Sequence, residues 1–169
     1  MREKKGSYQF LVEAALTIAL AMVFSKLVLF RLPQGGSVTL EIVPLLILSR
    51  RWGLKRGVIA GAVAGVLQWI LGGYVIHPLQ GLLDYPLAFA AMGLGALGSQ
   101  KVWPGILLAV VVRIICHVAS GVIFFASYAP EGTSALTYSI VYNGSFMLAN
   151  LIIALILVPL ILKRLDRLH

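Results

Sequence analysis

Short basic loops divide this sequence into six apolar runs. Crossing about 30 Å of hydrocarbon takes about 20 apolar residues in a helix, and five of the runs are that long. Because 60% of the residues are hydrophobic and only 12% are charged, the chain has too little polar surface to cover a soluble globule. The pattern predicts one domain over residues 1–169, an all-α integral membrane bundle of six transmembrane helices. The expected spans are 8–30, 38–49, 54–76, 79–98, 104–127 and 137–162.

The second run, 38–49, is too short to cross alone, because a helix of this length reaches only about 18 Å. The segment before it, residues 31–37, is polar and rich in glycine. Irregular backbone is tolerated at membrane depth only where protein or a water-filled cavity covers it. We therefore expect residues 31–37 to fold back over the bundle, to complete the second crossing, and to form a lid over a cavity.

The basic residues gather on one side of the predicted bundle. Lys and Arg concentrate in the cytoplasmic loops of membrane proteins, so both termini of this multi-pass cell-membrane protein are predicted to be cytoplasmic. Loops 31–37, 74–78 and 128–136 then face outward. This topology also explains the net charge of +8, which would otherwise suggest nucleic-acid binding. The basic residues on the cytoplasmic side are Arg2, Lys4, Lys5, Arg50, Arg51, Lys55, Arg56, Lys101, Lys163, Arg164 and Arg167.

Two of the expected spans carry small residues four apart. Gly57, Gly61 and Gly65 share one face of the third span, which favours close packing inside the bundle. Ala15 and Ala19 form a weaker stripe on the first span. Taken alone, that stripe also favours internal packing, with docking of a partner subunit as the alternative.

Ionisable residues inside a membrane are costly, so each is a candidate for a function. Glu13 and Lys26 lie near the two ends of the first span, where their side chains can reach the interface. Arg113 lies in the middle of the run 104–127. It is expected to bond backbone carbonyls or to hold an anion between helices.

Three polar residues from three different spans fall in the outer half of the membrane. Asp84 and Asn143 are each about 9 Å below the outer ends of their helices, and His117 is about 15 Å below. A lone carboxylate at this depth needs a positive partner, and we favour a ligand cation, with Lys26 or Arg31 as the alternative.

Aromatic residues surround the expected position of Asp84. His117, Gly121 and Phe125 are four apart and share a helix face, where Gly121 would leave room and Phe125 would offer a flat ring. The tyrosines expected at the same level are Tyr74, Tyr85 and Tyr138. An aromatic wall beside a carboxylate favours a flat cation. We expect an outward-facing pocket that binds a small, flat, positively charged molecule and performs no chemistry on it.

The sequence carries no sign of an enzyme, a metal site or a cofactor. It has no Walker-type glycine loop, so the chain is not expected to hydrolyse ATP itself. No paired carboxylates share a span, and no nucleophile lies beside a base. The three histidines, which lack the spacing of metal ligands on one helix, are His77, His117 and His169. A small membrane enzyme acting on lipid head groups remains an alternative, but it would need a second catalytic group beside Asp84 or His117.

Over nearly its whole length the chain resembles the thiamine-specific substrate-capture subunits (S-components) of energy-coupling factor vitamin transporters. The segments that carry the resemblance are 13–16 with Ala19, 33–37, 51–57, 83–89, 117–125 and 138–143. The resemblance implies capture of thiamine from outside, with the loop after the first helix as a lid. It also implies docking on a transmembrane coupling subunit driven by two ATP-binding subunits. A capture subunit for another vitamin or a thiamine precursor is the alternative.

The same resemblance implies roles for particular residues. Asp84 corresponds to the acidic residue that faces the ligand, and His117 to the pocket histidine. Tyr138 and Asn143 correspond to the pair that hydrogen-bonds the ligand. The further implied positions are ligand contact at Gly121, pocket lining at Tyr74 and Tyr85, and partner docking at Ala15 and Ala19.

Three features depart from the family pattern. Asp84 stands where members often carry Glu, Phe125 stands where a tryptophan often stacks on the ligand, and residues 31–37 contain no tryptophan. These differences predict a lower affinity for thiamine or a preference for a related aminopyrimidine. In addition, Tyr138 and Asn143 are about 140° apart around a helix, so they are expected to meet one ligand only if the helix begins at or after Tyr138.

Overall fold

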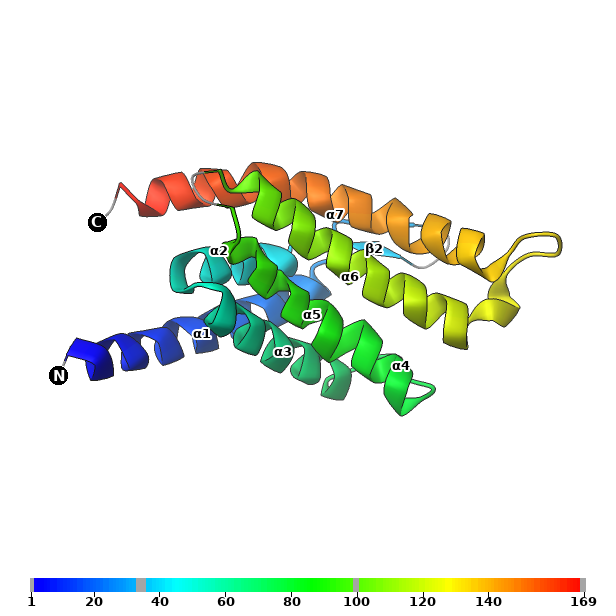
Figure 1. The fold of residues 1–169 in the computed structure, drawn as a ribbon, viewed down its shortest axis with the longest axis horizontal. Coiled ribbons are helices and arrows are strands. Elements are labelled where there is room, and N and C mark those ends of the chain that lie inside the picture. The colour runs from blue at the N-terminus through cyan, green and yellow to red at the C-terminus, as the bar shows by residue number, and fades with distance from the viewer. Residues whose placement is uncertain (1, 33–35, 99–100, 168–169) are drawn as a thin grey trace.

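The computed structural model describes residues 2–32, 36–98 and 101–167, which form an elongated helical bundle (Figure 1). The described residues form four long helices, one segmented helical rod and one short buried helix, joined by loops and a small hairpin. They are α1 (Arg2–Lys26), α2 (Ile42–Trp52), α3 (Leu54–Ile70), a segmented rod from Pro78 to Ala96, α6 (Trp103–Phe124) and α7 (Ala135–Leu165). The predicted all-α membrane fold is confirmed.

The segmented rod changes its helical type along its length. It comprises α4 (Pro78–Leu82), the π-helical turn η1 (Leu83–Leu87), α5 (Ala88–Ala90) and the 3-10 segment η2 (Ala91–Ala96). A second 3-10 turn, η3 (Ala126–Tyr128), follows α6. The strands β1 (Phe30–Arg31) and β2 (Ser37–Val38) form a short antiparallel hairpin between α1 and α2.

Three helical stretches of the described chain are long and apolar enough to cross a membrane, namely Gly6–Lys26, Trp103–Phe124 and Ala135–Leu165. The helices α3 and α2 are shorter, with 17 and 11 residues. Crossing by α2, α3 and the segmented rod therefore remains a prediction.

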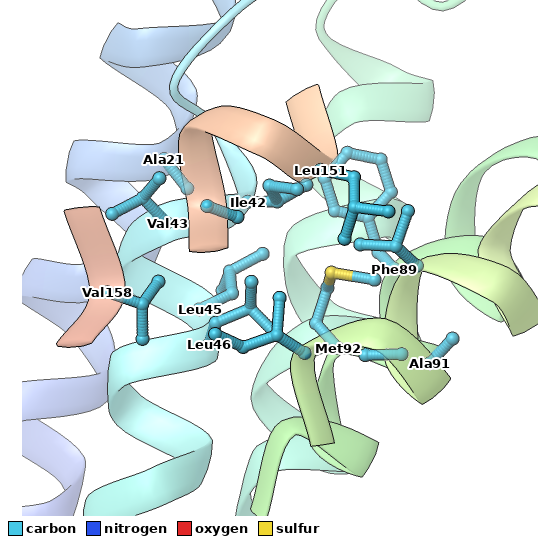
Figure 2. Packing of buried hydrophobic residues seen from close by; sticks show 14 of the residues in the cluster. Ala21, Ile42, Val43, Leu45, Leu46, Phe89, Ala91, Met92, Leu151 and Val158 are labelled. Carbon is cyan, nitrogen blue, oxygen red and sulfur yellow. The ribbon is translucent and has the colours of Figure 1, made fainter. Parts of the chain in front are cut away.

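The helix α2 lies inside the bundle and forms the centre of its core (Figure 2). It begins at Ile42, after the β-hairpin, and not at residue 38 as the apolar run suggested. Its residues Leu45, Leu46 and Leu48 are each 1% exposed. An apolar stretch this short is more often a buried core helix than a lipid-facing span. The surrounding helices bury it with Ala21, Phe89, Ala91, Met92, Leu151 and Val158.

Both termini lie at one end of the bundle, together with the tight junction between α2 and α3 (Figure 1). Gly53, with φ 85°, turns the chain between these two helices. Next to this junction, Arg51 Nε donates to Glu13 Oε1 of α1 at 2.5 Å. Glu13 therefore pairs with a basic residue of its own chain. The basic 50–56 segment is at the same end as the termini, as the topology prediction requires.

The glycine stripe of α3 packs inside the bundle, as predicted. A Cβ added at Gly57 would lie 2.5 Å from the Ser49 Cβ of α2. A Cβ at Gly61 would overlap the carbonyl oxygen of Phe89, and one at Gly65 would overlap that of Tyr85. The missing side chains thus let α3 approach the backbone of the segmented rod, which is how close helix contacts form in membranes.

Replacing Gly61 with alanine is therefore expected to lower the free energy of unfolding by about 1–3 kcal/mol, since the methyl group would displace backbone. Gly144 on α7 is the matched control, because a Cβ there meets no atom within 4 Å among the described residues. Thermal unfolding of the two purified variants in the same detergent measures the difference. A Gly61→Ala protein as stable as Gly144→Ala would contradict the close approach.

Candidate functional site

A cavity of about 490 Å³ opens between the segmented rod, α6 and α7. Small-molecule sites commonly occupy about 300–1,000 Å³. The structure places all eight residues predicted to bind a ligand on the wall of this one cavity. They are Tyr74, Asp84, Tyr85, His117, Gly121, Phe125, Tyr138 and Asn143. Their proximity is observed, whereas ligand binding by each of them stays a prediction.

Asp84 is held in this cavity by three hydrogen-bonding side chains. Gln80 Nε2 donates to Oδ2 at 2.6 Å, Ser120 Oγ donates to the same oxygen at 2.7 Å, and His117 Nδ1 lies 2.9 Å from Oδ1. No Lys or Arg in the described parts of the chain forms a salt bridge with Asp84. The alternative pairing with Lys26 or Arg31 is therefore not formed, and the carboxylate has no lysine or arginine counter-ion from these residues.

The local backbone explains how Asp84 comes to face the cavity. Pro86 has no N–H to donate, and its ring clashes with the carbonyl four residues before it in a regular α-helix. The rod widens there into the π-helical turn Leu83–Leu87, which contains Asp84. Such π-bulges occur frequently at functional sites.

Gln80, which was absent from the sequence prediction, connects Asp84 to the loop before α4. Its side chain is 2% exposed, and its Oε1 accepts from the Ile76 N–H at 3.1 Å. Its Nε2 also donates to the Tyr74 carbonyl at 3.2 Å. Gln80 lies four residues before Asp84, on the same helix face, and this spacing was the signal that could have revealed it.

One ring nitrogen of His117 is hydrogen-bonded, and the other has no hydrogen-bond partner among the described residues. An ionised carboxylate only accepts hydrogen bonds, so with Asp84 ionised His117 Nδ1 carries the proton. In the neutral form of the ring with this proton on Nδ1, Nε2 is an acceptor. This atom is buried and has no hydrogen-bond partner in the described structure. Buried polar atoms normally have a partner, so Nε2 is a candidate acceptor for a donor group on a ligand.

Aromatic rings form much of the cavity wall. On α7, the ring centroids of Tyr138 and Tyr142 are 6.0 Å apart, as are those of Tyr142 and Phe146. Across the mouth, Tyr74 and Phe125 are 6.3 Å apart. The sequence analysis missed Tyr142 and Phe146, although their four-residue spacing after Tyr138 predicts a shared face.

The start of the last helix does not meet the condition stated above for Tyr138 and Asn143 to share one ligand. The helix α7 begins at Ala135, before Tyr138, and yet both Tyr138 and Asn143 line the cavity. Two adjacent stripes of α7 face the cavity. One carries Tyr138 and Tyr142, and the other carries Ser139 and Asn143. A cavity that wraps around part of the helix can therefore touch residues about 140° apart.

Gly121 makes room for a neighbouring helix as well as for the cavity. A Cβ at this position would overlap the Ser139 hydroxyl of α7 and lie 3.0 Å from Ser139 Cβ. Ser139 Oγ donates to the Val118 carbonyl of α6 at 3.1 Å, and Asn143 Nδ2 donates to the Ser139 carbonyl at 3.0 Å. The glycine thus sets the close contact between α6 and α7 that positions Asn143. Phe125 lies just beyond α6, whose last residue is Phe124.

A second cavity of about 590 Å³ adjoins the first. The residues common to both walls are Tyr74, Asp84, Tyr85, His117, Tyr142 and Phe146. Beyond them lies an ion pair in which Arg113 Nη2 is 2.6 Å from Glu41 Oε1. Of the two roles expected for Arg113, holding an anion between helices is the one observed. The sequence analysis missed that anion, although Glu41 is a carboxylate within an apolar run.

The Asn150 side chain of α7 hydrogen-bonds the backbone next to and within β2 of the hairpin. Asn150 Oδ1 accepts from the Thr39 N–H at 2.9 Å, and Asn150 Nδ2 donates to the Ser37 carbonyl at 3.3 Å. These two backbone groups point to the same edge of β2, where a further strand would otherwise pair. Gly36 and Ser37 line the second cavity, as a covering loop would, whereas residues 33–35 of the predicted lid lie outside the described residues.

Replacing Asn150 with leucine is expected to leave those two backbone groups without their partner and to destabilise the hairpin locally by about 1–3 kcal/mol. Hydrogen exchange at the Thr39 amide measures this directly, and we expect exchange to be faster in the variant. The Val43 amide, which donates to the Leu40 carbonyl at 3.1 Å, is the internal control. Unchanged exchange at Thr39 would show that Asn150 does not hold the hairpin.

The small residues of α1 divide into two faces. Ala14 and Ala21 are 7% and 0% exposed and pack inside the bundle. Ala15 and Ala19 are exposed on the outer face. Internal packing, which the sequence alone favoured for Ala15 and Ala19, is therefore wrong. Both side chains lie on the surface of the bundle formed by the described residues.

Comparison with known proteins decides the family. The family model described as thiamine transporter protein (Thia_YuaJ) matches residues 11–169. This chain belongs to the thiamine transporter protein family. The predicted membership is thereby confirmed, and because the family consists of transporters, the enzyme alternative is set aside.

Individual members of the thiamine transporter family resemble the chain over most of its length. It is 34% identical to thiamine transporter ThiT of Bacillus subtilis (strain 168), covering 94% of this chain and 92% of that protein. It is 31% identical to thiamine transporter ThiT of Lacticaseibacillus paracasei (strain ATCC 334), covering 90% and 86%. A solved structure of ThiT from Listeria monocytogenes matches with a TM-score of 0.86 at 27% identity, covering 96% of this chain and 98% of that chain.

Proposed function

We propose that this chain captures thiamine from outside the cell as the substrate-binding subunit of an energy-coupling factor transporter. The observation that carries the proposal is the environment of Asp84. Its carboxylate is satisfied by Gln80, Ser120 and His117, and it faces a cavity without a salt bridge to any described Lys or Arg. A cationic ligand would supply the missing positive charge.

Thiamine has the chemistry that this cavity fits. Its thiazolium ring is a flat cation, for which Asp84 offers the charge and Phe125 and the tyrosines offer aromatic faces. Its aminopyrimidine ring carries an amino group, for which His117 Nε2 is a candidate acceptor. Asn143 and Tyr138 lie on the same wall and are proposed to bond this end of the ligand.

The two adjoining cavities together are called the chamber. The arrangement of the bundle supports an outward-facing chamber with cytoplasmic termini. The connection before α4 and the start of α7, which contribute to the chamber wall, lie at the end opposite the two termini (Figure 1). The basic segment 50–56 is at the end of the termini, which the positive-inside rule places in the cytoplasm.

Energy for uptake must come from other subunits, because the sequence has no Walker-type loop. We propose that the exposed Ala15 and Ala19 of α1 dock on a transmembrane coupling subunit that carries two ATP-binding subunits. Small residues let two membrane helices approach closely. Membrane lipid would cover the remaining exposed apolar surface.

Calorimetric titration of the purified protein with thiamine, riboflavin and biotin tests the proposal. We expect thiamine alone to bind tightly. The absence of binding heat with thiamine, together with tight binding of another vitamin, would identify a capture subunit with the same fold and a different ligand.

A further inference from the structure

A buried ion pair lies in the chamber wall close to Asp84. Arg113 Nη2 is 2.6 Å from Glu41 Oε1, and the two side chains are 10% and 16% exposed. Gln68 Nε2 donates to the second Glu41 oxygen at 3.1 Å. The Arg113 guanidinium lies 4.2 Å from the centroid of the Phe89 ring. The pair therefore joins the start of α2 to α3, α5 and α6.

The ion pair is close to the proposed cation site. Arg113 and His117 are four residues apart on α6, so they lie on one face about 6 Å apart along the axis. His117 in turn contacts Asp84 at 2.9 Å. Glu41, Arg113, Asp84 and His117 all line the same cavity. A net charge on the pair would therefore act on a ligand in the chamber.

The buried part of the cavity wall keeps a net negative charge only while this pair is intact. Glu41 and Arg113 cancel each other, which leaves Asp84 as the remaining buried carboxylate of the wall. Lys26 and Arg31 also line the cavity, but both are exposed, where water and salt screen their charge. Removal of Glu41 would leave a buried guanidinium that opposes a cationic ligand.

We infer that Glu41 is a specificity-determining residue, which neutralises Arg113 and so keeps the chamber selective for a cation. This inference rests on the proposed function, because it concerns the ligand of the same chamber. The ordinary structural role, tying four helical segments together, predicts instead that changes at the pair affect all ligands alike.

The test compares thiamine with a neutral isostere in which an uncharged ring replaces the thiazolium. In Glu41→Gln, the amide keeps the size of the side chain and removes its charge. We expect thiamine affinity to fall at least about tenfold, because an unpaired buried charge acts through a medium of low dielectric. The affinity of the neutral isostere should stay within about threefold of the wild type. Glu131→Gln, in an exposed loop, is the matched control and should change neither.

A second variant keeps the test decisive if Glu41→Gln does not fold. The double variant Glu41→Gln with Arg113→Gln removes both charges, and we expect thiamine affinity within about threefold of the wild type. A tenfold or greater loss of thiamine binding in the folded double variant would overturn the inference. Equal losses of both ligands in Glu41→Gln, or no loss of either, would also overturn it. A wild-type protein that binds no thiamine would overturn the proposed function itself.

Discussion

Replacing Asp84 with asparagine is expected to weaken thiamine binding by at least about tenfold, since removing one member of a desolvated charge pair typically costs more than 1.4 kcal/mol. Asparagine has nearly the size of aspartate but carries no charge. It also places an amide group among the donors Gln80, Ser120 and His117, which now bond two carboxylate oxygens. Loss of the negative charge weakens the attraction for a bound cation. The amide nitrogen also cannot accept the hydrogen bonds that a carboxylate oxygen accepts. Titration calorimetry of the purified variant measures the effect.

Two controls separate charge from folding in this experiment. Glu131→Gln removes a carboxylate from an exposed loop and should leave the affinity unchanged. A neutral isostere of thiamine should lose less affinity than thiamine does in Asp84→Asn. Unchanged thiamine affinity in Asp84→Asn would mean that Asp84 does not face the ligand.

Exchanging Ala15 or Ala19 for tryptophan is expected to abolish thiamine uptake while leaving thiamine binding intact. Both alanines are exposed on α1, and neither lines the chamber. A tryptophan there would hold the coupling subunit away from the helix, because close approach depends on small side chains. Uptake by cells or vesicles that contain all subunits, compared with binding to the purified chain, measures the two effects separately.

Ile152→Trp on α7 is the matched control for this pair of variants. Ile152 is 52% exposed on a different helix, so a tryptophan there should leave both binding and uptake normal. Uptake at the normal rate in Ala15→Trp and Ala19→Trp would remove α1 as the docking face. Loss of thiamine binding in these variants would instead show that the substitutions disturb the chamber.

The sequence predicted the membrane class and most helices because hydropathy responds directly to the hydrocarbon environment. It was less informative for α2, which is short and buried by protein, so that its apolar run extends into the hairpin at Ser37 and Val38. It also could not reveal the π-helical turn at Leu83–Leu87, where tertiary packing and Pro86 together set the backbone.

The chamber was predictable where its residues are unusual for a membrane span. Asp84, His117 and Asn143 stand out as polar residues in apolar surroundings, and the resemblance to a known family gave Tyr138 and Asn143 their expected role as a ligand-bonding pair. Neutral partners such as Gln80 are tolerated in many helices, and Gln80 could be found only through its four-residue spacing from Asp84. Contacts between distant segments, such as Asn150 with Thr39, depend on how the helices pack and cannot be derived from local spacing.

A crystal structure of the protein with thiamine bound tests the central claim most directly. We expect the thiazolium ring within about 6 Å of the Asp84 carboxylate, the distance at which an opposite charge strongly favours an ionised carboxylate. We also expect the aminopyrimidine end near His117, Tyr138 and Asn143. A structure in which Asp84 forms a salt bridge with a lysine or arginine of its own chain, and thiamine lies outside the chamber, would contradict the proposal.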